Sequence, residues 1–344
     1  MAANSITGDE SAATETGDAL PRAPLWHHLR QFVRWSQSLR FARRLVGLVD
    51  VTPDDFLFEL DDHEVARLQT IARRVRGATY RPAIFVNGVL PRSGTNFIAN
   101  ALALHPAIAA FPRRLYEFPL LQTAPGARAL RHEWLAHFPY NASLVRDHEF
   151  FACLASGWLA DLQGEAPDRH LLFKSPHLRQ LALFRATLPD DRLVVCLRDG
   201  RDVVASTLDS FKDHSRSTRR SFRQLVHEWR LATEAALDCA PDGPHAHPHT
   251  VIVRYEDMVA DQESEIRRIL PALGLDPAAF PFAQLERLPV FGSSAAGPDG
   301  EWRWRRAERD AGFKPVGRFA NWPEHRKRAF LHLAGDTLRR AGYL

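Results

Sequence analysis

From Arg81 onward, short runs of apolar residues alternate with longer segments in which apolar residues recur every three or four positions. Short runs with β-branched members are typical of buried strands, and the longer spacing is typical of helices. The pattern predicts strands over 83–87, 170–173, 192–197 and 250–254, with helices over 95–104, 148–163, 178–187, 201–210, 221–238, 261–273 and 323–341. Strands that alternate with helices favour an α/β fold with a parallel sheet.

The first 78 residues lack this alternation. Residues 1–24 are mostly small and polar, which predicts a disordered tail. Residues 25–78 are predicted to be a helical extension, and 79–344 a single α/β domain. The segment 25–49 is rich in arginine and contains no acidic residue. It fits either a helix packed on the main domain or a partner chain, or a peripheral contact with a membrane.

Composition narrows the class of protein. With 344 residues, 45% hydrophobic and 25% charged, the chain has enough apolar residues for a sizeable core. The net charge is +4, and arginine far outnumbers lysine, which favours forked binding of anionic groups over a generic nucleic-acid arm. The three cysteines show no metal or disulfide spacing, and no signal peptide or membrane-length apolar run is visible. We expect a cytoplasmic protein without a metal site.

A tight loop between the first predicted strand and its helix is the first candidate site. It lies within "FVNGVLPRSGTNFIANALALHP", residues 85–106. Backbone N–H groups and the positive end of a helix suit a phosphate or sulfate there. The loop of nucleoside-triphosphate enzymes ends in G-K-[ST], but Gly94 occupies the lysine position. The loop therefore favours an anion and is poorly equipped for ATP, although an ordinary glycine turn stays open.

Two other strand ends carry polar side chains. Lys174 and His177 follow one strand in "HLLFKSPH", and Arg198 follows the next in "RLVVCLRDGRDVVASTLDSF", with Ser206 two turns into the following helix. The carboxyl ends of parallel strands meet at one edge of a sheet and form the ligand crevice. Arg198 and Ser206 can therefore flank one anion. Taken singly, each residue also fits a surface ion pair or a solvated strand end.

With these segments in view, the sequence resembles the sulfotransferases that use 3′-phosphoadenosine 5′-phosphosulfate (PAPS). "PRSGTNFIANALALHP" is similar to their 5′-phosphosulfate loop, and "LRDGRDVVAS" has the form R-[DN]-x-x-D-x-x-x-S of their 3′-phosphate segment. "VIVRYEDMVADQESEIRRILPALGL" and "FKPVGRFANW" resemble two later segments of the family. The four segments, in the right order, span roughly 81–344. The bacterial and tyrosylprotein-type branch is closer than the cytosolic small-phenol branch.

The resemblance implies a P-loop-like three-layer fold with a central, mostly parallel sheet flanked by helices. It also implies a set of nucleotide-binding residues. These are Arg92, Ser93, Gly94, Thr95 and Asn96 for the 5′-phosphosulfate, Arg198 and Ser206 for the 3′-phosphate, Tyr255 near the adenine, and Gly317 and Arg318 in a late loop that covers the nucleotide. Asn96 replaces the usual second threonine, and its amide can still donate a hydrogen bond.

The implied reaction is in-line transfer of a sulfuryl group to an acceptor hydroxyl or amine, with release of 3′,5′-adenosine bisphosphate (PAP) and no metal. Lys174 would stabilise the leaving phosphate. Glu117 and His177 are both candidates for the general base. Glu117 is preferred because Pro176 occupies the position at which the small-phenol branch carries its histidine.

Two other functions are weighed against this one. A P-loop kinase using ATP and magnesium would need the absent loop lysine. A basic RNA- or membrane-binding protein would need an extended basic and aromatic surface, and no nucleic-acid partner is expected. The sequence does not specify the oligomeric state. The acceptor (carbohydrate, lipid, peptide or small natural product) also stays open, because acceptor pockets are built from variable loops.

Overall fold

The computed structural model describes residues 40–137, 141, 144–210, 220–288 and 315–344, with gaps at 41 and 44, together with short strands between 290 and 307. The predicted tail and most of the predicted helix at 25–49 lie outside the described residues. The helices are α3 (Asp62–Arg76), α4 (Thr95–Leu102), α5 (Ala124–His137), α6 (Glu149–Gly164), α7 (Leu181–Thr187), α8 (Gly200–Ser210), α9 (Phe222–Asp238), α10 (Tyr255–Ala260), α11 (Gln262–Ala272) and α12 (Glu324–Arg340).

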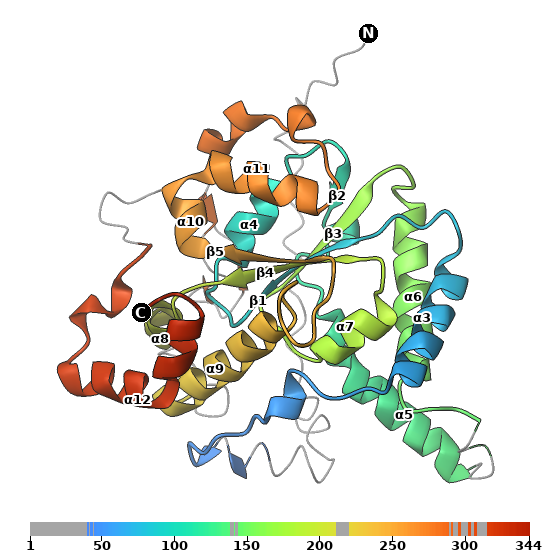
Figure 1. Ribbon diagram of the computed structural model, residues 1–344, viewed down its shortest axis with the longest axis horizontal. Coiled ribbons are helices and arrows are strands. Elements are labelled where there is room, and N and C mark those ends of the chain that lie inside the picture. The colour runs from blue at the N-terminus through green and yellow to red at the C-terminus, as the bar shows by residue number, and fades with distance from the viewer. Residues whose placement is uncertain are drawn as a thin grey trace.

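A five-stranded parallel sheet forms the centre of the molecule (Figure 1). Its strands are β1 (Ile84–Gly88), β2 (Ile108–Ala110), β3 (His170–Ser175), β4 (Arg192–Leu197) and β5 (Thr250–Arg254), in the order β2-β3-β1-β4-β5. Every neighbouring pair is parallel. The α/β prediction is therefore confirmed, and so are the four predicted strands to within two residues at either end.

The prediction missed β2, α5 and α10. β2 has only three residues, too few to show a period. α5 begins with Ala-Pro-Gly, a sequence that ordinarily marks a turn. Proline is tolerated there because the backbone N–H groups in the first turn of a helix have no acceptor within the helix. α10 follows β5 without any intervening loop residue.

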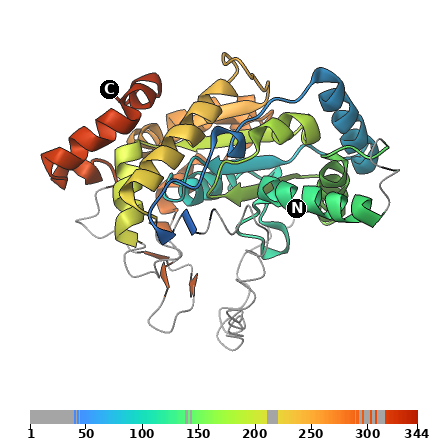
Figure 2. The same cartoon turned by 90° about the horizontal axis from the view of Figure 1, so that it is seen from below.

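Helices cover both faces of the sheet, giving three layers (Figures 1 and 2). α4, α10 and α11 pack on one face, which buries the side chains of Ile84 and Val86. α6, α7, α8 and α9 pack on the other face, with α3, α5 and α12 outside them. Because both faces are covered, the strands are continuous apolar runs instead of alternating ones.

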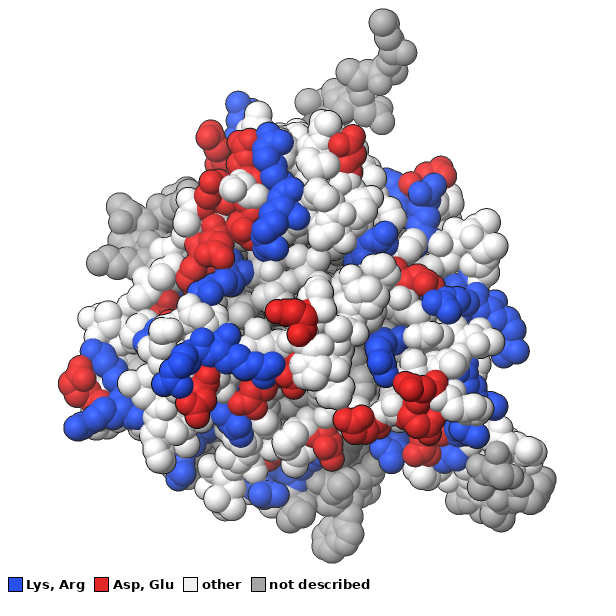
Figure 3. Space-filling view, in the orientation of Figure 1, with Lys and Arg blue, Asp and Glu red and all other residues white. Residues whose placement is uncertain are grey.

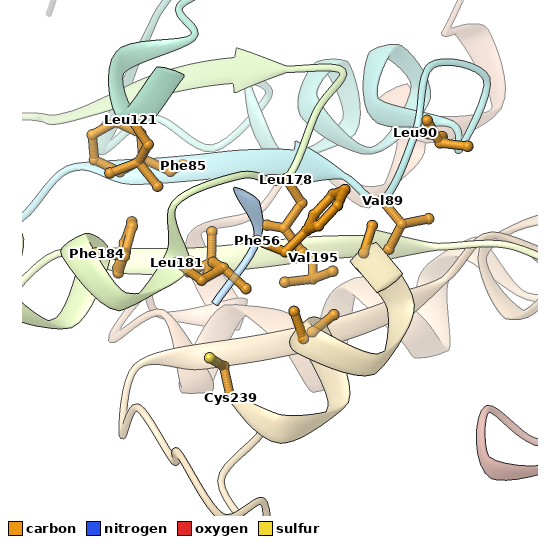
Figure 4. Close-up of a cluster of buried hydrophobic side chains, with 14 of the residues drawn as sticks. Phe56, Phe85, Val89, Leu90, Leu121, Leu178, Leu181, Phe184, Val195 and Cys239 are labelled. Atoms are coloured by element: carbon orange, nitrogen blue, oxygen red, sulfur yellow. The ribbon is translucent and has the colours of Figure 1, made fainter. Parts of the chain in front are cut away.

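The larger of the two cores lies on the face that carries Phe85 (Figure 4). The Phe85 ring centroid is 5.3 Å from that of Phe173 on the neighbouring strand and 5.6 Å from that of Phe184 on α7. Aromatic rings at these spacings fill the space between sheet and helices and hold the strand ends in fixed positions. The rigid sheet is thus the base on which the loops at its carboxyl edge are held.

The strand order also determines where a ligand can bind. β1 lies between β3 and β4, so the chain leaves β1 toward one side of the sheet and later crosses to the other. A crevice opens at the carboxyl edge of an open α/β sheet where the strand order reverses in this way. The loops after β1, β3 and β4 all reach this edge.

Later segments add two small antiparallel pairs, β6 (Val290–Phe291) with β9 (Arg306–Ala307) and β7 (Ala295–Ala296) with β8 (Trp302–Arg303). Within the described residues, no helix combines the length and apolar character needed to span a bilayer. On the face seen in Figure 3, basic and acidic side chains are interspersed, not gathered into one basic patch.

Candidate active site

The loop after β1 is held in a strained but well-braced conformation. Gly94 caps α4 with φ 94°, in the left-handed region. A Cβ atom at this position would lie 2.3 Å from Tyr255 Cδ2, so only glycine fits. The N–H groups in the first turn of α4 have no acceptor inside the helix, which is the arrangement that binds anions.

Ser93 braces this loop from within. Its side chain is fully buried, and the hydroxyl donates to the Leu90 carbonyl at 2.7 Å and accepts from the Leu90 N–H at 3.2 Å. The hydroxyl is thereby committed to the loop itself. The structure thus places Ser93 as a support of the loop rather than as a side-chain donor to a ligand.

Three arginines converge beside this loop, and two of them donate to the hydroxyl of Ser206. Arg92 Nε donates to Ser206 Oγ at 3.0 Å, and Arg318 Nη1 donates to the same oxygen at 3.2 Å. Arg198 Nη1 donates to the Arg92 carbonyl at 2.7 Å. The segments after β1, after β4 and before α12 therefore meet at one buried point.

This cluster has an excess of positive charge. Burial, together with the charges of Arg318 and Arg198, lowers the pKa of Arg92 to about 10. Burial also lowers the pKa of Arg198, whose Nε is buried and makes no hydrogen bond within the described structure. Within the residues that the structure describes, neither Arg92 nor Arg198 forms an ion pair with a carboxylate. Arg198 is buried and Arg92 is half-buried, and their positive charge is what a bound phosphate dianion would neutralise.

Tyr255 connects the loops after β1 and β4. The Arg198 guanidinium carbon lies 4.4 Å from the centroid of the Tyr255 ring, a cation–π contact. The other contacts of the ring are with Gly94 and with Phe97, whose ring centroid is 6.2 Å away. Tyr255 thus lies directly against the glycine loop and against Arg198.

Asn96, Glu117 and Lys174 form a second cluster at the same edge. Lys174 Nζ donates to Asn96 Oδ1 at 2.6 Å and to Glu117 Oε1 at 3.3 Å. Lys174 is 3% exposed, so it is not a solvated strand end. Burial lowers its pKa, and Glu117 opposes that change. The Glu117 side chain is 41% exposed, so a ligand can reach its carboxylate.

His177, the other candidate base, follows Ser175 in the turn after β3. Its backbone N–H donates to Ser175 Oγ at 3.4 Å, and it lines a small cavity together with Asn87 and Arg179. Glu117 is the candidate base whose side chain forms an ion pair with Lys174. In the described ranges, no three His, Cys, Asp or Glu side chains come together as metal ligands.

A model of the sulfotransferase family matches residues 82–279, more than half of the chain. This chain belongs to the sulfotransferase family. The match covers both clusters except Gly317 and Arg318, and it agrees with the resemblance found in the sequence.

Individual relatives of this sulfotransferase are distant. Protein-tyrosine sulfotransferase A of Caenorhabditis elegans is 24% identical over 200 residues, which are 56% of this chain; the chain spans about half the length of that relative. A mouse sulfotransferase, SULT7A1, solved in complex with PAP, is 14% identical with a TM-score of 0.45, covering 81% of this chain and 90% of that one. The sulfotransferase STF1 of Mycobacterium tuberculosis is 17% identical with a TM-score of 0.39, covering 62% and 73%. At these scores no residue role can be carried across.

Sequence reasoning missed one residue that organises the site of this sulfotransferase. Asp202 is fully buried, and its two carboxylate oxygens accept from Gly317 N at 2.8 Å and Phe319 N at 3.2 Å. It therefore fixes the late loop that carries Arg318. Asp202 is the second acidic position of the R-[DN]-x-x-D-x-x-x-S pattern, so the signal was present in the sequence.

Trp229 on α9 was missed as well. Its indole N–H donates to the Arg198 carbonyl at 3.2 Å, and its ring fills the space where a Cβ on Gly200 would be 2.4 Å away. The tryptophan thereby fixes the turn after β4 from the core side. No local pattern in the sequence marks it.

Proposed function

We propose that this sulfotransferase takes its sulfuryl group from PAPS and transfers it by in-line displacement to an acceptor hydroxyl. The observation that carries the proposal is the convergence of three arginines at one point: Arg92 and Arg318 donate to the Ser206 hydroxyl, and Arg198 donates to the Arg92 carbonyl. A 3′-phosphate bound there would neutralise the cluster. ATP has no group at that position, so the cluster favours PAPS over ATP.

In the proposed reaction the 5′-phosphosulfate lies at the start of α4, within reach of Lys174 and the Asn96 amide. The acceptor oxygen attacks sulfur as its proton passes to the Glu117 carboxylate. The bond between sulfur and the bridging 5′-phosphate oxygen breaks, and its electron pair stays on that oxygen. The Lys174 ammonium stabilises the negative charge that develops on the departing phosphate of PAP.

For the acceptor we propose a hydroxyl-bearing molecule, with a phenol as the first class to test. The support is the similarity to a protein-tyrosine sulfotransferase, whose name refers to the phenolic hydroxyl of tyrosine. The partly exposed carboxylate of Glu117 beside Lys174 is suited to receive the proton of such a hydroxyl.

The test is calorimetric titration with PAP, compared with ATP plus magnesium, on the wild type, Arg198→Ala and a matched control. Arg339→Ala is the control, because Arg339 is exposed and its guanidinium pairs with the exposed Asp336, away from both clusters. We expect PAP to bind without metal, Arg198→Ala to lose at least tenfold in affinity, and the control to match the wild type. A preference for ATP with magnesium, or PAP binding that is indifferent to Arg198, would contradict the proposal.

A further inference from the structure

Residues 341–343, which follow α12, contact Arg201 and Arg254, on the segments that follow Arg198 and precede Tyr255. Figure 1 shows this end of the chain beside α8, and the contacts explain why. Arg254 at the end of β5 donates from Nη1 to the Ala341 carbonyl at 3.1 Å and from Nη2 to the Gly342 carbonyl at 2.9 Å. Its guanidinium carbon is 4.3 Å from the centroid of the Tyr343 ring. The Tyr343 ring is therefore fixed against the end of β5.

The hydroxyl of Tyr343 continues this contact to the end of β4. It donates to Glu256 Oε2 at 2.9 Å, and Glu256 Oε1 accepts from the Asp199 N–H at 3.1 Å. Arg201 completes the connection: it pairs with the Asp199 carboxylate and also donates to the Tyr343 carbonyl at 3.1 Å. One tyrosine thus joins the segment 199–201 to Glu256.

These two segments directly adjoin the residues that form the cation–π contact of the site. Asp199 follows Arg198, and Glu256 follows Tyr255. We therefore expect a change in the spacing of Asp199 and Glu256 to shift Arg198 relative to the Tyr255 ring, 4.4 Å away. Neither the hydroxyl nor the ring of Tyr343 is directed to the crevice, since Glu256 and Arg254 occupy them.

We infer that Tyr343 is a positioning residue for nucleotide binding, which sets the placement of Arg198 and Tyr255 through the bridge Tyr343–Glu256–Asp199. The inference rests on the proposed function, because the nucleotide in question is PAPS or PAP. The hydrogen bond from the Tyr343 hydroxyl to the Glu256 carboxylate is charge-assisted and partly buried, so loss of this bond loosens both segments together.

The test compares Tyr343→Phe with Tyr80→Phe. Tyr80 is a close match, because its hydroxyl donates at 2.7 Å to the buried Asp191, whose carboxylate also accepts a backbone N–H, that of Ala83. That bridge lies at the amino edge of the sheet, away from the site. Calorimetry with PAP and with adenosine 5′-monophosphate, and urea unfolding, are measured for both variants and the wild type.

We expect Tyr343→Phe to weaken the binding of PAP about tenfold and that of adenosine 5′-monophosphate much less. Arg198 is assigned to the 3′-phosphate, which adenosine 5′-monophosphate lacks. Tyr80→Phe should lose comparable stability and keep PAP affinity within about twofold. If Tyr343→Phe unfolds, Glu256→Ala, which removes both acceptor oxygens of the bridge, should show the same selective loss. Where both single variants fold, the double variant should lose no more PAP affinity than the more affected single variant, since Tyr343 and Glu256 act as one unit.

PAP affinity unchanged in Tyr343→Phe, with only stability reduced, would overturn the inference and leave the proposed function intact. The same conclusion follows if Tyr343→Phe weakens the binding of PAP and of adenosine 5′-monophosphate equally. Absence of PAP binding by the wild type would overturn the proposed function, and this inference with it.

Discussion

Glu228→Gln tests whether the buried charges beside the site stabilise the fold. Glu228 on α9 is 3% exposed at its side chain, and it pairs with Arg179, at 2.5 Å, and with Arg220. Burial alone would raise the pKa of Glu228, but the charges of Arg220 and Arg179 outweigh it and lower the pKa from 4.5 to about 2. Removing this carboxylate would leave two arginines without their shared partner.

The pKa change sets the size of the effect. At 1.36 kcal/mol per pKa unit, a fall from 4.5 to 2 corresponds to about 3 kcal/mol of the free energy of unfolding at neutral pH. The folded-state pKa lies below the unfolded-state value. The stabilisation is therefore complete above about pH 5 and is lost as the pH falls toward 2. Between pH 6 and pH 3 the linkage relation gives a loss of about 2 kcal/mol.

Urea unfolding at intervals from pH 6 to pH 3 measures this directly in the wild type and Glu228→Gln. Glutamine does not titrate, so acid effects elsewhere in the protein cancel in the difference between the two. We expect that difference to shrink by about 2 kcal/mol as the pH falls. Glu263→Gln is the control: its pair with Arg267 is exposed, so it should cost less than about 1 kcal/mol at any pH. A wild-type-to-variant difference that does not change with pH would refute the reasoning.

Three further substitutions probe the site. Ser206→Ala removes the oxygen shared by two arginines and should weaken PAP binding about tenfold by calorimetry, with kcat at saturating PAPS unchanged. Glu117→Gln should lower kcat about 10²–10⁴-fold in a radiolabelled transfer assay and leave PAP affinity intact. If His177→Gln shows this fall in kcat and Glu117→Gln does not, His177 is the base. Gly94→Ala would place a Cβ 2.3 Å from a ring carbon of Tyr255 and should abolish PAP binding. Gly126→Ala is the control, because a Cβ at position 126 meets open space; this variant should bind PAP normally and be as stable as the wild type or more so.

Sequence patterns predicted the parts of the fold that depend on local order. β1, its loop and α4 follow one another within 20 residues, so apolar spacing and the glycine at position 94 were sufficient. The meeting of three strand ends at one edge followed from the rule for parallel sheets alone. For the same reason, the sequence alone was enough to place Lys174 and Arg198 at the same edge of the sheet.

Contacts between distant segments could not be predicted in this way. Arg318 and Ser206 are 112 residues apart, and Tyr343 and Glu256 are 87 apart. No periodicity links such pairs, and nothing in the sequence shows that the two members of a pair contact each other. The resemblance to the family placed Arg318 in a covering loop, but only the structure shows that Asp202 holds that loop in place.

The two clusters differ in charge balance, and the difference matches the tasks proposed for them. Arg198 is buried and Arg92 half-buried, and within the described residues neither forms an ion pair with a carboxylate, which suits binding of a 3′-phosphate throughout the reaction. Lys174 and Glu117 are a pair of opposite charges 3.3 Å apart, so they carry no net charge before the reaction. In the proposed reaction, transfer of the acceptor proton to Glu117 would make the pair positive at the moment when the departing 5′-phosphate becomes more negative. The proton transfer itself would thus provide the charge that stabilises the leaving group, which is an interaction made in the transition state and not in the bound substrate.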